Sequence, residues 1–140
     1  MNKDRVTKNE IRAYFSVYPK NIAPEELTKL IGLKPYKTHL KGDPVVQNNL
    51  EGPKFKDNFW SIKSQADPSV SLEEHLENLL DQLRPYKNKI LQYTGDMYKE
   101  LAFTIFCNEG RPGVHINKKL LQELTDYGIE IDMDIYFKKS

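Results

Sequence analysis

The stretch Leu120–Phe137, LLQELTDYGIEIDMDIYF, changes its hydrophobic period at Gly128. Before this glycine, leucines recur at three- and four-residue spacing, which is typical of an amphipathic helix. After it, apolar and polar residues alternate strictly, which is typical of a strand with one buried face. A glycine at the junction can adopt the left-handed conformation that ends a helix. The stretch therefore predicts a helix that leads directly into a strand.

The same two periods take turns along the rest of the chain. The clearest helix is predicted over residues 71–83, where Ser71 and Glu74 form a capping-box pattern and leucines follow at helical spacing. Pro85 breaks or kinks this helix, which can resume until Gly95. The chain is thus expected to pack long leucine-rich helices against strands.

A short helix is predicted over residues 24–31, because Pro24 suits a first helical position and Gly32 can close the helix. The predicted strands cover residues 11–18, 36–41, 58–64, 99–107, a short segment around Val114 and Ile116, and 129–137. The face opposite the apolar residues of the first strand carries Arg12, Tyr14, Ser16 and Tyr18. The order is β-α-β-β-α-β-β-α-β. We therefore expect one α+β domain over residues 1–140, with its core at about 11–137 and about three helices on one face of a mostly antiparallel sheet.

Composition predicts a cytoplasmic protein. Cys107 is the single cysteine, which excludes an internal disulfide and suits a reducing compartment. No run approaches the roughly 20 apolar residues of a membrane span. The N-terminal stretch MNKDRVTKNEIRAYF has no apolar core of signal-peptide length. Neither a membrane segment nor a leader is expected.

Charge and motifs argue against a nucleic-acid partner. The formal net charge is only +1, although the first 63 residues carry an excess of basic side chains and the remainder an excess of acidic ones. Residues 34–41 mix lysines with Tyr36 and His39, as single-strand binders do. The chain lacks an RNP-like motif and a recognition helix, and its glycines match neither the P-loop nor the dinucleotide fingerprint.

Metal and thiol chemistry have little support in the residue spacing. His39, His75 and His115 fall on separate elements, and none has a second ligand at metal spacing. His75 is expected on the solvated side of its helix, because the leucines take the inner face. Cys107 falls on the apolar face of its strand and is predicted to be a buried structural thiol, although His115 could lie near it across the intervening turn. We expect no metal, no cofactor and no catalytic residues.

Three carboxylates share one face of the last predicted strand. Glu130, Asp132 and Asp134 alternate with apolar residues, so their side chains project about 6.5–7 Å apart along the strand. They could bind a cation or the basic surface of a partner. The alternative is the wet face of a sheet, whose acids discourage edge pairing.

Lys37, His39 and Lys41 form a second charged row. Pro35 favours an extended chain, and alternation then places these three side chains on the face opposite Tyr36. The row is a candidate contact surface for a partner, and protection of an edge strand is the alternative.

Several segments occur in an order that resembles a known family. They are PEELTKLIGLKP (24–35), a later GD (42–43), FWSIKS (59–64), LEEHLENLLDQL (72–83) and the terminal LLQELTDYGIEIDMDIYF (120–137). Together they resemble the bacterial family called domain of unknown function 4279, over roughly residues 11–137. The resemblance implies a small stand-alone bacterial α+β protein and supplies no catalytic positions. By analogy, some small bacterial proteins of this kind are toxin-neutralising immunity proteins.

Two functional hypotheses follow from these residues. The first is a non-catalytic protein-binding module, in the manner of an immunity protein, whose two charged rows contact a partner. The second is an enzyme or small-ligand binder with a cleft near Trp60 and His115. Against the second, a lone tryptophan between apolar strand residues is more often part of the core.

Overall fold

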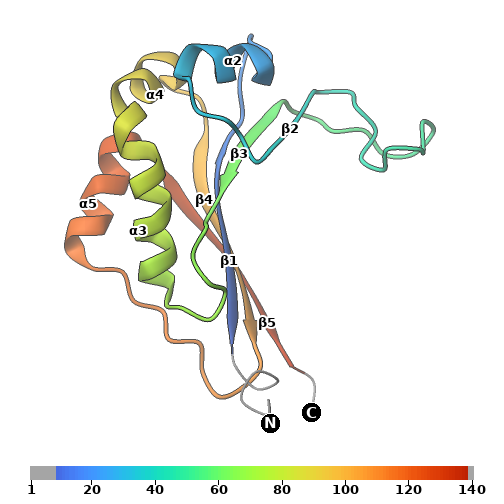
Figure 1. Ribbon diagram of the computed structural model, residues 1–140. Helices are drawn as coiled ribbons and strands as arrows, with labels where there is room; N and C mark the ends of the chain where they lie inside the picture. Colours follow the sequence, from blue (N-terminus) through green and yellow to red (C-terminus); the bar gives the residue numbers. More distant parts are fainter. Residues whose placement is uncertain (1–8, 139–140) are drawn as a thin grey trace.

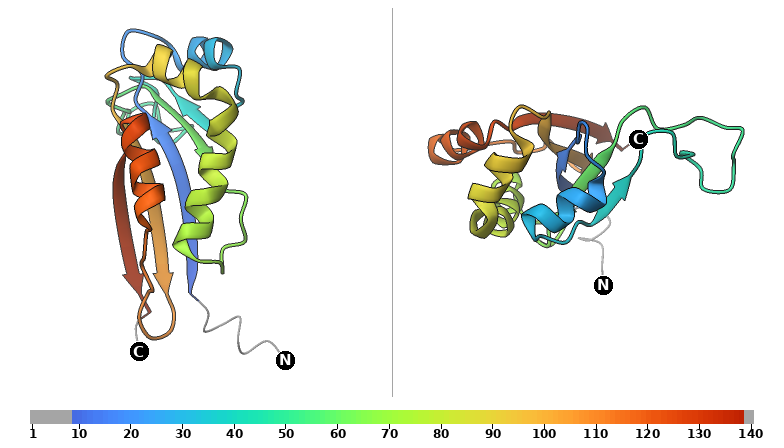
Figure 2. Two further views of the ribbon diagram at one scale, coloured as in Figure 1. Left: turned by 90° about the vertical axis from the view of Figure 1, so that its left-hand side faces the viewer. Right: turned by 90° about the horizontal axis from the view of Figure 1, so that it is seen from above.

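The computed structural model describes residues 9–138, which form a five-stranded sheet with helices on one face (Figures 1 and 2). The strands are β1 (Glu10–Val17), β2 (Lys37–His39), β3 (Phe59–Lys63), β4 (Lys99–Cys107) and β5 (Glu130–Phe137). The helices are α2 (Pro24–Ile31), α3 (Leu72–Leu83), α4 (Lys87–Thr94) and α5 (Lys118–Tyr127), with a 3₁₀ turn, η1 (Arg84–Tyr86), between α3 and α4. The predicted α+β class is confirmed.

The strand order in the sheet is β2-β3-β1-β4-β5. All neighbours are antiparallel except β4 and β5, which are parallel and joined through α5. The prediction of a mostly antiparallel sheet is therefore confirmed. Residues 40–58 connect β2 to β3 as a long arm that projects away from the sheet (Figure 1).

The short strand predicted around Val114 and Ile116 does not form, and the chain between β4 and α5 is irregular. Both edges of β4 are already hydrogen-bonded, to β1 and to β5, so β4 leaves no edge for a hairpin partner. Pro112 also removes a backbone donor in this segment. The irregular connection instead brings the chain back along the helical side to the start of α5 (Figure 2).

Capping at the helix ends follows the sequence pattern. The side chain of Ser71 accepts a hydrogen bond from the backbone N–H of Glu74 (3.2 Å), and Asn117 accepts one from Leu120 (2.9 Å). Gly128 has φ +72°, a left-handed conformation that ends α5 and directs the chain into β5. Since Pro85 lies in the 3₁₀ turn, the predicted kink between α3 and α4 is confirmed.

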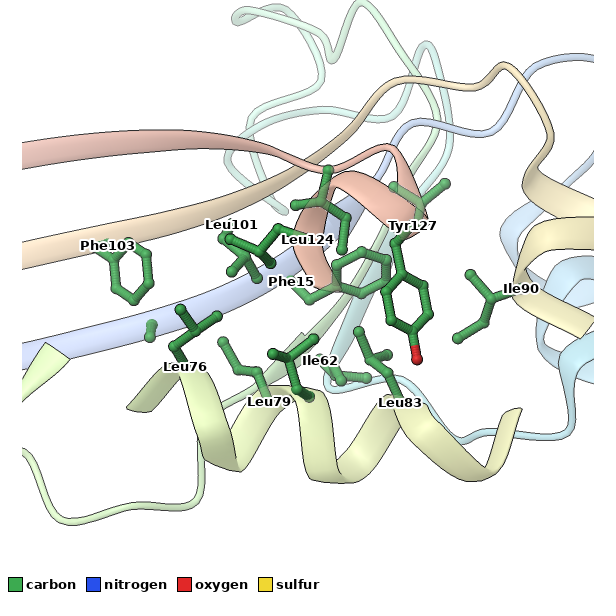
Figure 3. Packing of buried hydrophobic residues seen from close by; sticks show 14 of the residues in the cluster. Phe15, Ile62, Leu76, Leu79, Leu83, Ile90, Leu101, Phe103, Leu124 and Tyr127 are labelled. Atoms are coloured by element: carbon green, nitrogen blue, oxygen red, sulfur yellow. The ribbon is translucent and has the colours of Figure 1, made fainter. Parts of the chain in front are cut away.

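The core lies between the sheet and the helices (Figure 3). The sheet contributes Ala13, Phe15, Val17, Trp60, Ile62, Leu101, Phe103 and Ile105. The helices contribute Leu27, Ile31, Leu72, Leu76, Leu79, Leu80, Leu83, Ile90, Leu120, Leu124 and Tyr127. Burial of this set on one side of the sheet leaves the polar halves of the strands on the other side.

His75 is buried, at 1 % exposure, so the prediction of a solvated histidine is wrong. The connection from β3 to α3 covers that side of the helix, and the Oγ of Ser64 lies 2.8 Å from the Nδ1 of His75. Burial lowers the pKa of His75 below its ordinary value, because the apolar surroundings disfavour the charged imidazole.

Acidification is therefore expected to weaken the fold through His75. Because the folded-state pKa lies below that of the unfolded chain, the contribution is complete above about pH 6.5 and is lost as the pH falls further. Urea denaturation between about pH 8 and pH 5 measures this slope. His75→Gln should flatten it. Equal slopes for wild type and His75→Gln would contradict the prediction.

Candidate functional site

The face of the sheet opposite the helices is covered by no helix of residues 9–138 (Figure 2). One in-register row of residues crosses all five strands on this open face. Lys37 on β2 pairs with Ser61 on β3, Ser61 with Ser16 on β1, Ser16 with Glu100 on β4, and Glu100 with Glu130 on β5. The row thus begins at a lysine, crosses two small serines and ends at two glutamates.

The serines leave a hollow in the open face, because the rows on either side carry large aromatic rings. We call this hollow the sheet recess; its volume is about 360 Å³. It is lined by Tyr14, Ser16, Tyr18, Tyr36, Lys37, Phe59, Ser61, Glu100 and Ala102. Ser16 and Ser61 are only 3 % and 2 % exposed, so they form its floor.

Two pairs of aromatic rings stand around this floor. The rings of Tyr14 and Tyr36 have centroids 6.0 Å apart, and those of Tyr18 and Phe59 are 5.5 Å apart. The second pair joins the end of β1 to the neighbouring β3, and the first reaches from β1 across β3 to the start of β2. The walls are thus held by mutual ring contacts as well as by the strands.

A carboxylate held by two tyrosines stands at the acidic end of the recess. The hydroxyl of Tyr18 donates to Oε1 of Glu100 (3.1 Å), and that of Tyr98 donates to Oε2 (3.4 Å). Burial and the charge of Glu100 raise the pKa of Tyr18 to about 12, and the same causes raise the pKa of Tyr98. Both hydroxyls therefore stay protonated at neutral pH. Within residues 9–138, no Lys, Arg or His side chain forms an ion pair with Glu100.

The predicted basic row only partly lies on the open face. Lys37 lines the recess. The ring of His39 stacks between those of Phe55 and Phe59, with centroids 3.4 and 4.8 Å away, and burial followed by the nearby Lys37 lowers its pKa. Lys41 lies beyond the end of β2 and is exposed, with its backbone N–H bonded to the side chain of Asn58.

The prediction that Tyr36 faces away from Lys37 is wrong, since both line the recess. The N–H of Tyr36 bonds to the carbonyl of Ser61 (2.7 Å), while Lys37 is the register partner of that same serine. Two residues thus oppose one, as in a bulge, and strict alternation is lost at the start of β2.

The acidic row continues from the acidic end of the recess. Glu130, Asp132 and Asp134 are exposed on β5, beside Glu100, Ala102 and Thr104 of β4. Among the described residues, no three His, Cys, Asp or Glu side chains are grouped so that they could hold a metal ion. Lys37 and the acidic row are thus brought to one face, at its opposite edges.

Trp60 and His115 are not brought together. Trp60 is 0 % exposed, and its Nε1–H donates to the Oγ1 of Thr28 (2.9 Å) in the core. His115 is exposed, and its Nε2 lies 3.8 Å from a carboxylate oxygen of Glu73. Neither residue lines the recess.

Cys107 is buried, as predicted, and its Sγ lies 3.2 Å from the carbonyl of Gly110. The structure gives no support to the alternative pairing of this thiol with His115, because the contact of that imidazole is with Glu73.

Two larger hollows, of about 520 and 650 Å³, lie on the helical side. Charged side chains of α3 and α5 dominate their lining, and Arg84 satisfies several of the acids there. Its guanidinium bonds to both oxygens of Glu123 (2.8 and 2.9 Å), to Glu77 (3.1 Å) and to Asp81. The sheet recess differs because its walls are aromatic and its carboxylate has no cationic partner among the described residues.

Fold and site define an α+β protein with one helix-covered and one open sheet face, the latter bearing an aromatic recess between basic and acidic edges. The chain belongs to the family described as domain of unknown function 4279 (DUF4279), whose model matches residues 9–138 and confirms the resemblance. No curated protein and no solved structure matches the chain. No helix of the described residues combines the length and hydropathy of a membrane span.

Proposed function

We propose that the protein is a non-catalytic binding module that holds a protein partner on the open face of its sheet. The observation that carries the proposal is the sheet recess, which lies between a basic and an acidic edge of this face. Its rim is aromatic, with Tyr36 at 57 % exposure, and exposed aromatic side chains are enriched where proteins bind one another. Opposite charges at the two edges would fix the orientation of a partner with complementary charges.

A buried Ser–His pair supports the non-catalytic part of the proposal. Ser64 and His75 have nucleophile and base atoms at hydrogen-bond distance, 2.8 Å, as a catalytic pair requires. Both side chains are buried where the connection from β3 packs against α3, so a substrate has no access to them. The pair instead joins this connection to the helix.

Within the binding class, we propose a toxin-neutralising role in the bacterial cytoplasm. The acidic row on β5 would complement the basic surface that a nucleic-acid-cleaving toxin uses to hold phosphates. The single cysteine supports a reducing compartment. We also expected the chain to have no leader. Residues 1–8, on which part of that expectation depends, lie outside the described residues.

Reversing the charges of the acidic row is expected to lower the affinity for a captured partner about tenfold or more, because rim charges of complementary sign direct association. The variant combines Glu130→Lys, Asp132→Lys and Asp134→Lys. The partner is captured from native cytoplasm, identified and purified, and its dissociation constant is measured by calorimetry for wild type and variant.

The matched control reverses three exposed acids on the helical side, Glu26, Glu74 and Asp126. Circular dichroism checks that both triple variants fold. If the control lowers the affinity for the partner as much as the β5 variant does, specific docking on the open face is disproved. If the partner binds on this face but does not inhibit growth when expressed alone, the toxin-neutralising role fails and the binding module stands.

A further inference from the structure

We propose that the sheet recess receives a cationic side chain, lysine or arginine, presented by the protein partner. This inference rests on the proposed function and names the group that the recess recognises.

The walls of the recess suit a cation. The face of an aromatic ring attracts an ammonium or guanidinium group within about 6 Å of its centroid. The same face of the sheet already uses this contact twice: Lys63 Nζ lies 5.3 Å from the Tyr36 centroid, and Arg12 Cζ lies 5.3 Å from that of Phe106. The rings of Tyr14, Tyr18 and Phe59 complete the wall around the floor.

Glu100 provides the counter-charge at one end of the recess. An ionised carboxylate can accept about four hydrogen bonds, and the hydroxyls of Tyr18 and Tyr98 provide two. The two hydroxyls also fix the orientation of the carboxylate. Lone pairs therefore remain for a charge-assisted bond from an entering cation, which is stronger than a bond between neutral groups.

The electrostatic field at this end is negative. Glu130 is the register neighbour of Glu100 on β5, and Asp132 follows it on the same face. The charges of Glu100, Glu130 and Asp132 all contribute to raising the pKa of Tyr98, after its burial. An anionic group would be repelled here, whereas a cation would meet several acids.

Lys37 does not cancel this preference. It stands three strand spacings from Glu100 along the row, about 14 Å between backbones. Within residues 9–138, Lys37 forms no ion pair with Glu100. A cation beside Glu100 is therefore governed by the nearer acids, and Lys37 is free to meet an acidic group of the partner.

The binding test uses capped pentapeptides with a central arginine, lysine, citrulline or glutamate, titrated into ¹⁵N-labelled full-length protein. The arginine and lysine peptides should shift amide signals of the recess strands β1, β3 and β4, with millimolar affinity. Citrulline keeps the shape of arginine without its charge and should bind at least about fivefold more weakly, equivalent to roughly 1 kcal/mol. Equal binding of arginine and citrulline, or shifts confined to other elements, overturns the inference.

Two variants test the recess in the protein. Glu100→Gln removes the counter-charge, and Ser16→Leu fills the floor of the recess. Each should lower the affinity for the arginine peptide at least about fivefold. Glu74→Gln on α3, at an exposed position, is the matched control and should change nothing. Arginine binding that persists in Glu100→Gln overturns the inference even if Ser16→Leu does not fold.

Failure of the inference is distinguishable from failure of the proposed function. If reversal of the β5 acids weakens the partner but Glu100→Gln and Ser16→Leu do not, the recess is not the recognition site and the binding module stands. If no protein docks on the open face, the proposed function fails, and with it the claim that a protein partner supplies the cation.

Discussion

Replacing Trp60 with alanine is expected to lower the free energy of unfolding by about 3–5 kcal/mol. The side chain is fully buried, its ring meets Phe15 edge-on at 6.4 Å, and its Nε1–H is bonded to Thr28 on α2. Alanine would leave a cavity between β3 and α2 and an acceptor without its donor. Urea denaturation followed by circular dichroism measures the loss. Tryptophan fluorescence cannot be used, because Trp60 is the only tryptophan.

Two controls accompany this variant. Trp60→Phe keeps most of the volume and should cost less than Trp60→Ala. Leu50→Ala, at a position 73 % exposed on the arm, should change stability by less than about 0.5 kcal/mol. A fully stable Trp60→Ala protein that had lost binding of a small ligand would instead favour the alternative hypothesis of a cleft near this residue.

Replacing Tyr127 with alanine is expected to cost a similar amount, about 3–5 kcal/mol. Its ring lies near Leu83 and Ile90, and joins α5 to the other helices over the sheet (Figure 3). Because α5 leads directly into β5, weaker packing of α5 should also destabilise β5, the strand that carries the acidic row. Chemical denaturation gives the loss in stability, and hydrogen exchange of β5 amides reports the local effect.

Tyr127→Phe separates the ring from the hydroxyl. The hydroxyl is buried without a hydrogen-bond partner among the described residues, so its removal should leave stability equal to wild type or about 1 kcal/mol higher. Burial raises the pKa of Tyr127 to about 12, and therefore wild type should lose stability as the pH rises from about 10 to 12. Tyr127→Phe should lose less, and a large loss at neutral pH in this variant would disprove the argument.

Local patterns predicted the elements because each depends on neighbours in the chain. The caps at Ser71 and Asn117 and the helix end at Gly128 need only a few adjacent residues, and the structure confirms all three. The expected strand at Val114 failed because edge availability on β4 depends on β5, which no local pattern reveals. His75 was misplaced because the connection from β3 to α3, which directly precedes this helix, folds back over a side of α3 that looks polar in the sequence.

The sheet recess could not be predicted, because it depends on register between strands far apart in the chain. Alternation did place Tyr14, Ser16 and Tyr18 on the outer face of β1. Two tyrosines flanking a serine on a solvent-exposed face were the available sequence signal for a recess. What was missing is that Ser16 stands beside Ser61 and Glu100. The strand order also decides that Lys37 and the acidic row occupy opposite edges of one face.

The central position of β1 ties assembly of the sheet recess to completion of the chain. Tyr14 pairs with Lys63 on one side and with Ala102 on the other, and β5 adds the outermost acids last. A ribosome that has made only the first half of the protein has made β1, β2 and β3 but not Glu100. Pairings of such long sequence separation form slowly, since a large loop must close first. A chain that ends before β4 therefore has Tyr14 and Tyr18 without the counter-charge of Glu100, and the proposed partner would bind only after β4 has been made.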